Sequence, residues 1–187
     1  MPIAVGADFA WLQDTTALVP YLRVDESHQY FGDLEILTPP RDGTMPPASE
    51  VKAAFLAIHE RNPIDTVVMD MSKANEIAQW LSDDLGVTVV DRPQTNSFAQ
   101  DDYDFMVQAV SRRWIHHTGH RELRRHVLNA IARRLPGDKH RSDRPSTSRN
   151  VKKQDRRVID ALTAASMVLA HFSTVEEQKP KVPLAAW

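Results

Sequence analysis

The pattern of hydrophobic and polar positions predicts strands in the first forty residues. Runs rich in Val, Leu, Tyr and Thr predict strands at 3–9, 13–24 and 28–38. The short links between these runs allow only tight turns, so we expect the three strands to form an antiparallel meander. Pro and Gly residues then mark a loop over 39–47.

From residue 49 onward, helical and extended patterns alternate. Ser49 is a suitable N-cap for the first helix, and Gly86 is a suitable residue to end the second. The predicted order is helix 50–61, strand 65–70, helix 73–85 and strand 87–91. A strand, a helix and a strand joined in this way form a βαβ unit, so the two strands should be parallel.

The second half of the chain has a helical pattern. It predicts helices at 98–115, 121–134 and 154–172, a polar loop or weak hairpin over 137–153, and a loosely held tail at 175–187. The fold class is therefore α/β. We expect one domain over residues 1–174, with a mixed sheet in the strand order 3-2-1-4-5 flanked by helices.

Composition excludes several classes of site. The chain has 187 residues, of which 42% are hydrophobic and 26% charged, as in an ordinary globular protein. It has no Cys, which excludes disulfides, thiolate nucleophiles and Cys-based metal sites. We expect no membrane association, because no apolar run approaches the length of a span and the N-terminus lacks the features of a signal peptide.

Charge is distributed unevenly along the chain. Residues 112–157 hold 15 Lys and Arg but only 4 Asp and Glu, whereas the whole chain has a net charge of −2. A basic block on an otherwise acidic chain can contact a polyanion, although a solvated helix surface is also compatible with it.

Three acids occur in apolar surroundings. Asp8 lies within the first strand, Asp70 ends the fourth, and Asp160 lies in the last helix. In the expected strand order, strands one and four are neighbours, so a C-terminal helix packed on the sheet could bring Asp160 to both. Converging carboxylates repel one another unless cations share the site, and hard divalent cations take such oxygen ligands. The alternative for each acid alone is a salt bridge or a solvated turn.

Several segments in this order resemble the C-terminal nuclease domain of the large terminase subunit of tailed bacteriophages, from about residue 3 to residue 172. They are VGADFAWLQDTTALV (5–19), TVVMDMSKANEIAQWL (66–81), VVDRPQT (89–95), HVLNAIARR (126–134) and RRVIDALTAASMVLA (156–170). The resemblance implies an RNase H-like fold. It also implies metal-dependent endonucleolytic cutting of phage DNA during packaging.

By position, the resemblance makes Asp8, Asp70 and Asp160 the catalytic and metal-binding acids, holding two Mg²⁺ or Mn²⁺ ions. Basic residues near the last helix would bind double-stranded DNA: Arg144, Arg149, Lys152, Lys153 and Arg156. Asp91 could also approach the site, and Asp14 could support it. Asp65 is expected on the far side of the sheet.

The resemblance further implies a packaging ATPase domain, a small terminase subunit and a portal as partners, with action in the host cytoplasm. The sequence has no G-x-x-x-x-G-K-[ST] motif, so we expect either an excised domain or a separately encoded nuclease, monomeric in isolation. Two alternatives remain open. One is another RNase H-like nuclease, such as a junction resolvase or an integrase relative, and the other is a non-catalytic DNA-binding module.

Overall fold

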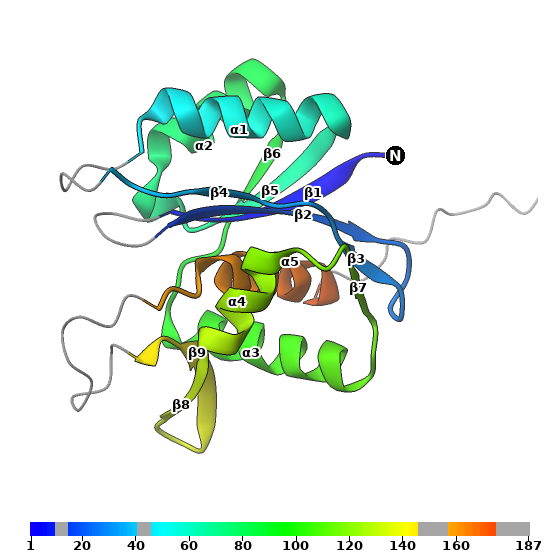
Figure 1. Cartoon of the computed structure of the whole chain (residues 1–187), viewed down its shortest axis with the longest axis vertical. Helices are drawn as coiled ribbons and strands as arrows, with labels where there is room; N and C mark the ends of the chain where they lie inside the picture. The colour runs from blue at the N-terminus through cyan, green and yellow to red at the C-terminus, as the bar shows by residue number, and fades with distance from the viewer. Residues whose placement is uncertain (10–14, 41–45, 146–156, 175–187) are drawn as a thin grey trace, which may run out of the picture.

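A computed structural model describes residues 1–9, 15–40, 46–145 and 157–174. It has three layers, with a central sheet between two sets of helices (Figure 1). Helices α1 (Ala48–Arg61) and α2 (Asn75–Leu85) cover one face of the sheet. The other face is covered by α5 (Asp160–Thr174), with α3 (Asn96–Ser111) and α4 (Arg121–Asn129) packed around it. No helix within the described ranges is long and apolar enough to cross a membrane.

The central sheet is mixed, as predicted. Its strands are β1 (Ile3–Asp8), β2 (Thr16–Arg23), β3 (Gln29–Phe31), β4 (Glu35–Leu37), β5 (Ile64–Met69), β6 (Thr88–Asp91) and β7 (Ile115–His117). Their order is β6-β5-β1-β2-β3-β7, and β4 also pairs with β2. The first strands are antiparallel, whereas β5 is parallel to both β1 and β6. The predicted order 3-2-1-4-5 is therefore confirmed, and β7 is an additional edge strand.

The expected third strand is divided in two at Gly32. Strand β3 pairs with the end of β2 and β4 pairs with its beginning. Pro20 lies in β2 opposite the break, and its carbonyl oxygen accepts a hydrogen bond of 3.0 Å from Gly32 N. Proline has no N–H to return to the ladder, so continuous pairing is interrupted at this point.

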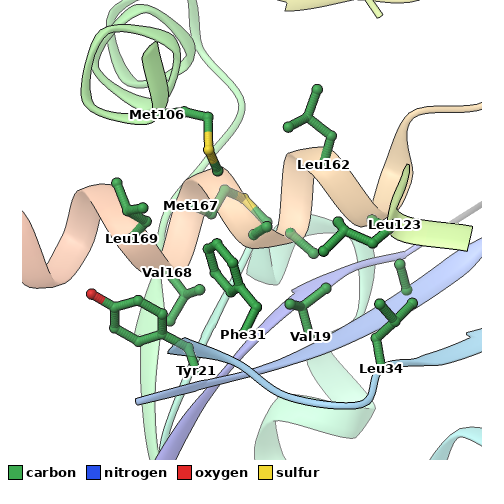
Figure 2. Packing of buried hydrophobic residues seen from close by; sticks show 14 of the residues in the cluster. Val19, Tyr21, Phe31, Leu34, Met106, Leu123, Leu162, Met167, Val168 and Leu169 are labelled. Atoms are coloured by element: carbon green, nitrogen blue, oxygen red, sulfur yellow. The ribbon is translucent and has the colours of Figure 1, made fainter. Parts of the chain in front are cut away.

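Two hydrophobic cores lie on opposite faces of the sheet, because side chains alternate along a strand. From β1, Val5 and Ala7 pack with residues of α1 and α2, whereas Ala4 packs with residues of α5. Figure 2 shows the core on the face covered by α5, in which Met167 and Val168 of α5 lie beside strand residues such as Val19. Gly6 and Asp8 share the face of Ala4, so both point toward α5.

Helix α5 approaches β1 very closely at Gly6. A Cβ atom at this position would lie 2.0 Å from the carbonyl oxygen of Ala164 and 2.8 Å from its carbonyl carbon. Neither backbone atom can rotate away. Only glycine therefore allows the observed spacing between this helix and the centre of the sheet.

The helix boundaries differ from the predictions in three places and agree in one. Helix α1 begins at Ala48 after Pro47 without a side-chain cap, so Ser49 is not the N-cap. A short 3₁₀ turn, η1 (Met71–Lys73), precedes α2. Gly86 ends α2 with a φ of 64°, as predicted. Helix α3 ends at Ser111, and residues 115–117 form β7 instead of a last helical turn.

The predicted helix 121–134 is wrong in its second half. Helix α4 ends at Asn129, and β8 (Ile131–Leu135) pairs with β9 (Lys139–Asp143) in an antiparallel hairpin. The turn between them contains Gly137 and Asp138, both with positive φ. Pairing across this turn outweighs the modest helix propensity of the segment. Within the expected loop or weak hairpin over 137–153, residues 139–143 form the second strand of this hairpin, and residues 146–153 lie outside the described residues.

The last helix begins at Asp160, not at residue 154, and residues 157–159 are not helical. His126, a fully buried residue of α4, accepts a hydrogen bond of 2.9 Å at Nδ1 from Ala161 N. Burial lowers the pKa of His126 to about 4, so the imidazole is neutral and can accept this bond. The expected tail at 175–187 lies outside the described residues, and the single domain over 1–174 stays a prediction.

The close contact at Gly6 predicts that adding one methyl group there strongly destabilises the fold. Gly6→Ala should lower the free energy of unfolding by roughly 3 kcal/mol or more, because a backbone atom of α5 must move. Urea denaturation measures the change. Gly137→Ala is the control: its φ is 79° and its Cβ would meet nothing within 4 Å, so strain alone should cost about 1 kcal/mol. Equal losses in the two variants would contradict the close-approach argument.

Candidate active site

The three predicted acids lie at the carboxyl ends of two neighbouring strands and at the start of the helix that covers them. Asp8 is the last residue of β1, and Asp70 follows directly after β5. Strands β1 and β5 are parallel neighbours in which Ala7 pairs with Met69, so Asp8 and Asp70 leave the sheet at the same level. Asp160 is the first residue of α5. All three are buried, with 7%, 7% and 9% of their surfaces exposed.

The contact between Gly6 and Ala164 explains why Asp8 and Asp160 approach each other. Asp8 lies two residues after Gly6, about 6.6 Å further along the strand. Asp160 lies one helical turn before Ala164, about 6 Å along the helix axis. The helix and the strand run in opposite directions, so the two carboxylates are placed at the same end of the contact.

The electrostatics of Asp8 reflect this arrangement. Its pKa is raised to about 7, chiefly because burial disfavours the charged form. The positive charge of Lys73 opposes this rise, whereas the negative charge of Asp160 adds to it. The structure therefore brings Asp8 and Asp160 within electrostatic range of each other.

Gln94 joins Asp8 to Asp70. Its side-chain amide donates a 3.0 Å hydrogen bond from Nε2 to Asp8 Oδ1. Its backbone N–H donates a 3.3 Å bond to Asp70 Oδ2. One residue from the loop after β6 thus contacts the acids of two neighbouring strands.

Each acid also has a further polar partner. The ammonium group of Lys73 lies 3.4 Å from Asp8 Oδ1. Asp70 Oδ1 accepts hydrogen bonds of 3.1 Å and 2.6 Å from Ser72 N and Ser72 Oγ. Asp160 Oδ2 accepts bonds of 2.8 Å and 2.6 Å from Thr15 N and Thr15 Oγ1. Buried carboxylates are expensive without such donors.

The loop that carries Gln94 is anchored by a buried ion pair. Arg92 donates from Nε to Asp102 Oδ1 of α3 at 2.6 Å, and both side chains are buried. The backbone N–H of Arg92 also donates to Met69 O at 2.8 Å. These two contacts fix the start of the loop against β5 and α3. They therefore set the position of Gln94 beside the acids.

Other acids discussed above have different roles. Asp91 is exposed, and its Oδ1 accepts a 3.0 Å bond from Met71 N, which supports the turn after Asp70. Asp65 is exposed at the opposite end of β5. Asp14 lies outside the described residues.

Sequence reasoning missed three residues of the site: Thr15, Lys73 and Gln94. Lys73 and Gln94 follow closely after the ends of β5 and β6, where the carboxyl ends of parallel strands meet. Their position just after these strand ends was the signal in the sequence that could have identified Lys73 and Gln94 as site residues. Thr15 lies just before β2, and no pattern in the sequence indicates its contact with Asp160.

The donor set fits a hard divalent cation, because it consists of carboxylate oxygens from three elements. In the described part of the chain, however, no three acidic or histidine side chains form a group that could hold a metal ion. Protein donors occupy carboxylate oxygens of all three acids. Cation binding at this site would therefore require at least some of these donors to be exchanged for the ion.

Only one of the five predicted DNA-binding residues falls within the described ranges. Arg144 follows β9 and is half-buried, and its backbone N–H donates to Asp143 Oδ1 at 2.8 Å. Arg149, Lys152, Lys153 and Arg156 lie in residues 146–156, which are not described. The neighbouring hairpin exposes Arg133 and Arg134, which form ion pairs with Asp143 and Asp138.

Comparison with known proteins gives matches only at the level of structure. No model of a protein family matches the chain, and no curated protein matches it. The large terminase nuclease of thermophilic phage G20c superposes with a TM-score of 0.66 at 17% identity, covering 94% of this chain and 83% of that one. The HK97 bacteriophage large terminase gives a TM-score of 0.72 at 17% identity, covering 91% of this chain and 39% of that one.

Some of these similar structures contain metal ions. The nuclease domain of the large terminase of bacteriophage SPP1, solved with bound Mn, has a TM-score of 0.55 at 12% identity and covers 94% of this chain and 88% of that one. The G20c nuclease has been solved with bound magnesium, cobalt and zinc. The present chain therefore has the RNase H-like fold of the nuclease domains of phage large terminases.

Proposed function

We propose that this protein is a metal-dependent endonuclease that cuts double-stranded phage DNA during genome packaging. The proposal is carried by the position of Asp8 and Asp70 at the ends of neighbouring parallel strands, bridged by Gln94, with Asp160 within electrostatic range of Asp8. The shared fold and the metal ions in similar structures support it.

Asp8, Asp70 and Asp160 would hold two Mg²⁺ or Mn²⁺ ions. When bound, such ions activate a water molecule for attack on phosphorus and stabilise the leaving oxygen. The protein itself supplies fixed carboxylates. Gln94 orients Asp8 and Asp70, and Thr15 orients Asp160. No protein nucleophile is needed for this reaction class.

Basic residues next to the site would bind the DNA backbone. Arg144 and the segment bearing Arg149, Lys152, Lys153 and Arg156 lie between β9 and α5 in the chain, which places them near Asp160 in sequence. Contacts of Arg and Lys with phosphates position DNA without reading its sequence. As partners we propose a packaging ATPase domain, a small terminase subunit and a portal, with action in the host cytoplasm.

Removal of one carboxylate should abolish cleavage. Asp8→Asn and Asp160→Asn keep the side-chain shape but remove a charged ligand, so nicking of plasmid DNA with Mn²⁺ should fall at least about a hundredfold. Asp65→Asn is the matched control, since this exposed acid lies at the other end of β5. Circular dichroism confirms folding. Cleavage at the wild-type rate by either site variant would refute the assignment.

Metal binding should stabilise the folded protein. At Mn²⁺ concentrations of 100 times the Kd, the expected gain is about 2.7 kcal/mol, or roughly 5 to 10 °C in Tm. Differential scanning fluorimetry with and without Mn²⁺ measures the shift. Asp8→Asn should show no shift. A non-catalytic DNA-binding module would bind DNA in a salt-sensitive way and show no Mn²⁺-dependent shift even in the wild type.

The raised pKa of Asp8 predicts a pH dependence of metal binding. In the folded protein this carboxyl group stays protonated below its pKa of about 7, whereas its ordinary pKa is 3.8. A cation must displace that proton, so Mg²⁺ affinity should fall about tenfold for each pH unit below 7 and level off above it. Isothermal titration calorimetry between pH 5.5 and 8.5 tests this. A profile that is flat through pH 7 would contradict it.

A further inference from the structure

Lys73 occupies an unusual position beside the acids. It ends the short turn η1 that follows Asp70, yet its ammonium group lies 3.4 Å from Oδ1 of Asp8 on the neighbouring strand. Only 26% of its side chain is exposed, and 9% of that of Asp8. A long cationic side chain therefore reaches the largely buried carboxylate of Asp8.

The contact meets an electrostatic need of the protein without metal. Asp8 is buried, and the negative charge of Asp160 further disfavours its ionised form. Lys73 supplies the opposing positive charge. Two like charges in a poorly solvated site require such a counter-ion, or else a proton.

The same contact obstructs a cation that would bind Asp8. A divalent ion on Oδ1 and an ammonium group at the same oxygen repel each other, and this repulsion is poorly screened where solvent is largely excluded. Binding of the ion must therefore move the Lys73 side chain toward solvent. The four-carbon stem and the partial exposure of Lys73 allow this movement.

We propose that Lys73 is a built-in counter-ion that competes with the divalent metal for Asp8 and so lowers the metal affinity of the site. The inference rests on the proposed nuclease function. Lys73 neutralises the acids in the metal-free protein and gives way when the ion enters. Metal affinity is thus set by a residue that is not itself a ligand.

The test compares Mg²⁺ affinity, measured by isothermal titration calorimetry at pH 8.5, in four proteins. Lys73→Met removes the competing charge and should bind Mg²⁺ roughly three- to tenfold more tightly than the wild type. Lys73→Arg keeps the charge and should stay near the wild-type affinity. Lys52→Met is the matched control, because Lys52 also pairs with an acid at 3.3 Å and has 30% exposure, but its partner is Glu76 on α2. Its affinity should not change.

The outcomes separate the two proposals. Equal or weaker Mg²⁺ binding by Lys73→Met, beside normal binding by the wild type, would overturn the role of Lys73 and leave the nuclease proposal intact. If Lys73→Arg binds Mg²⁺ as tightly as Lys73→Met does, the role of Lys73 is also overturned, because the charge would then be irrelevant. If neither the wild type nor Lys73→Met binds Mg²⁺, the metal site itself is wrong.

Discussion

The close approach of α5 to β1 is the constraint on which the candidate site depends. Gly6 allows the carbonyl of Ala164 to lie almost against the strand, and no other residue would. This single contact fixes both the depth and the register of the helix. Asp8 and Asp160 then come within electrostatic range, because each lies a similar distance from this contact in opposite chain directions. The rest of the fold supports this pair, with α1 and α2 on the other face of the sheet and α3 and α4 packed around α5.

Tight packing also determines which residues surround the acids. Water is largely excluded, so each carboxylate needs protein donors, and the structure supplies them from three loops through Thr15, Lys73 and Gln94. The loop of Gln94 is in turn fixed by the buried pair of Arg92 and Asp102. Burial raises the pKa of Asp102 to about 6, yet the nearby guanidinium favours its charged form. A polar network thus reaches from α3 to the end of β1.

Much of this arrangement could be predicted from the sequence, because it follows from periodicity. The strand pattern placed Asp8 in the first strand and Asp70 at the end of the fourth, and the expected strand order made these two strands neighbours. The hairpin of β8 and β9 could not be predicted in the same way, since pairing across its turn decides its structure. The contacts of Lys73 and Gln94 also depend on how separate loops fold toward one edge. Neighbouring sequence carries little information about such contacts.

The order of the elements along the chain has a consequence for the time at which the site appears. Asp8 belongs to the first strand, whereas Asp160 belongs to the last helix of the described fold. Since Asp160 is part of α5, a growing chain on the ribosome lacks one of the three acids of the candidate site until α5 has emerged and docked. A protein built in this way cannot bring the three acids together while its chain is still incomplete, and a truncated product that lacks α5 would lack Asp160 altogether.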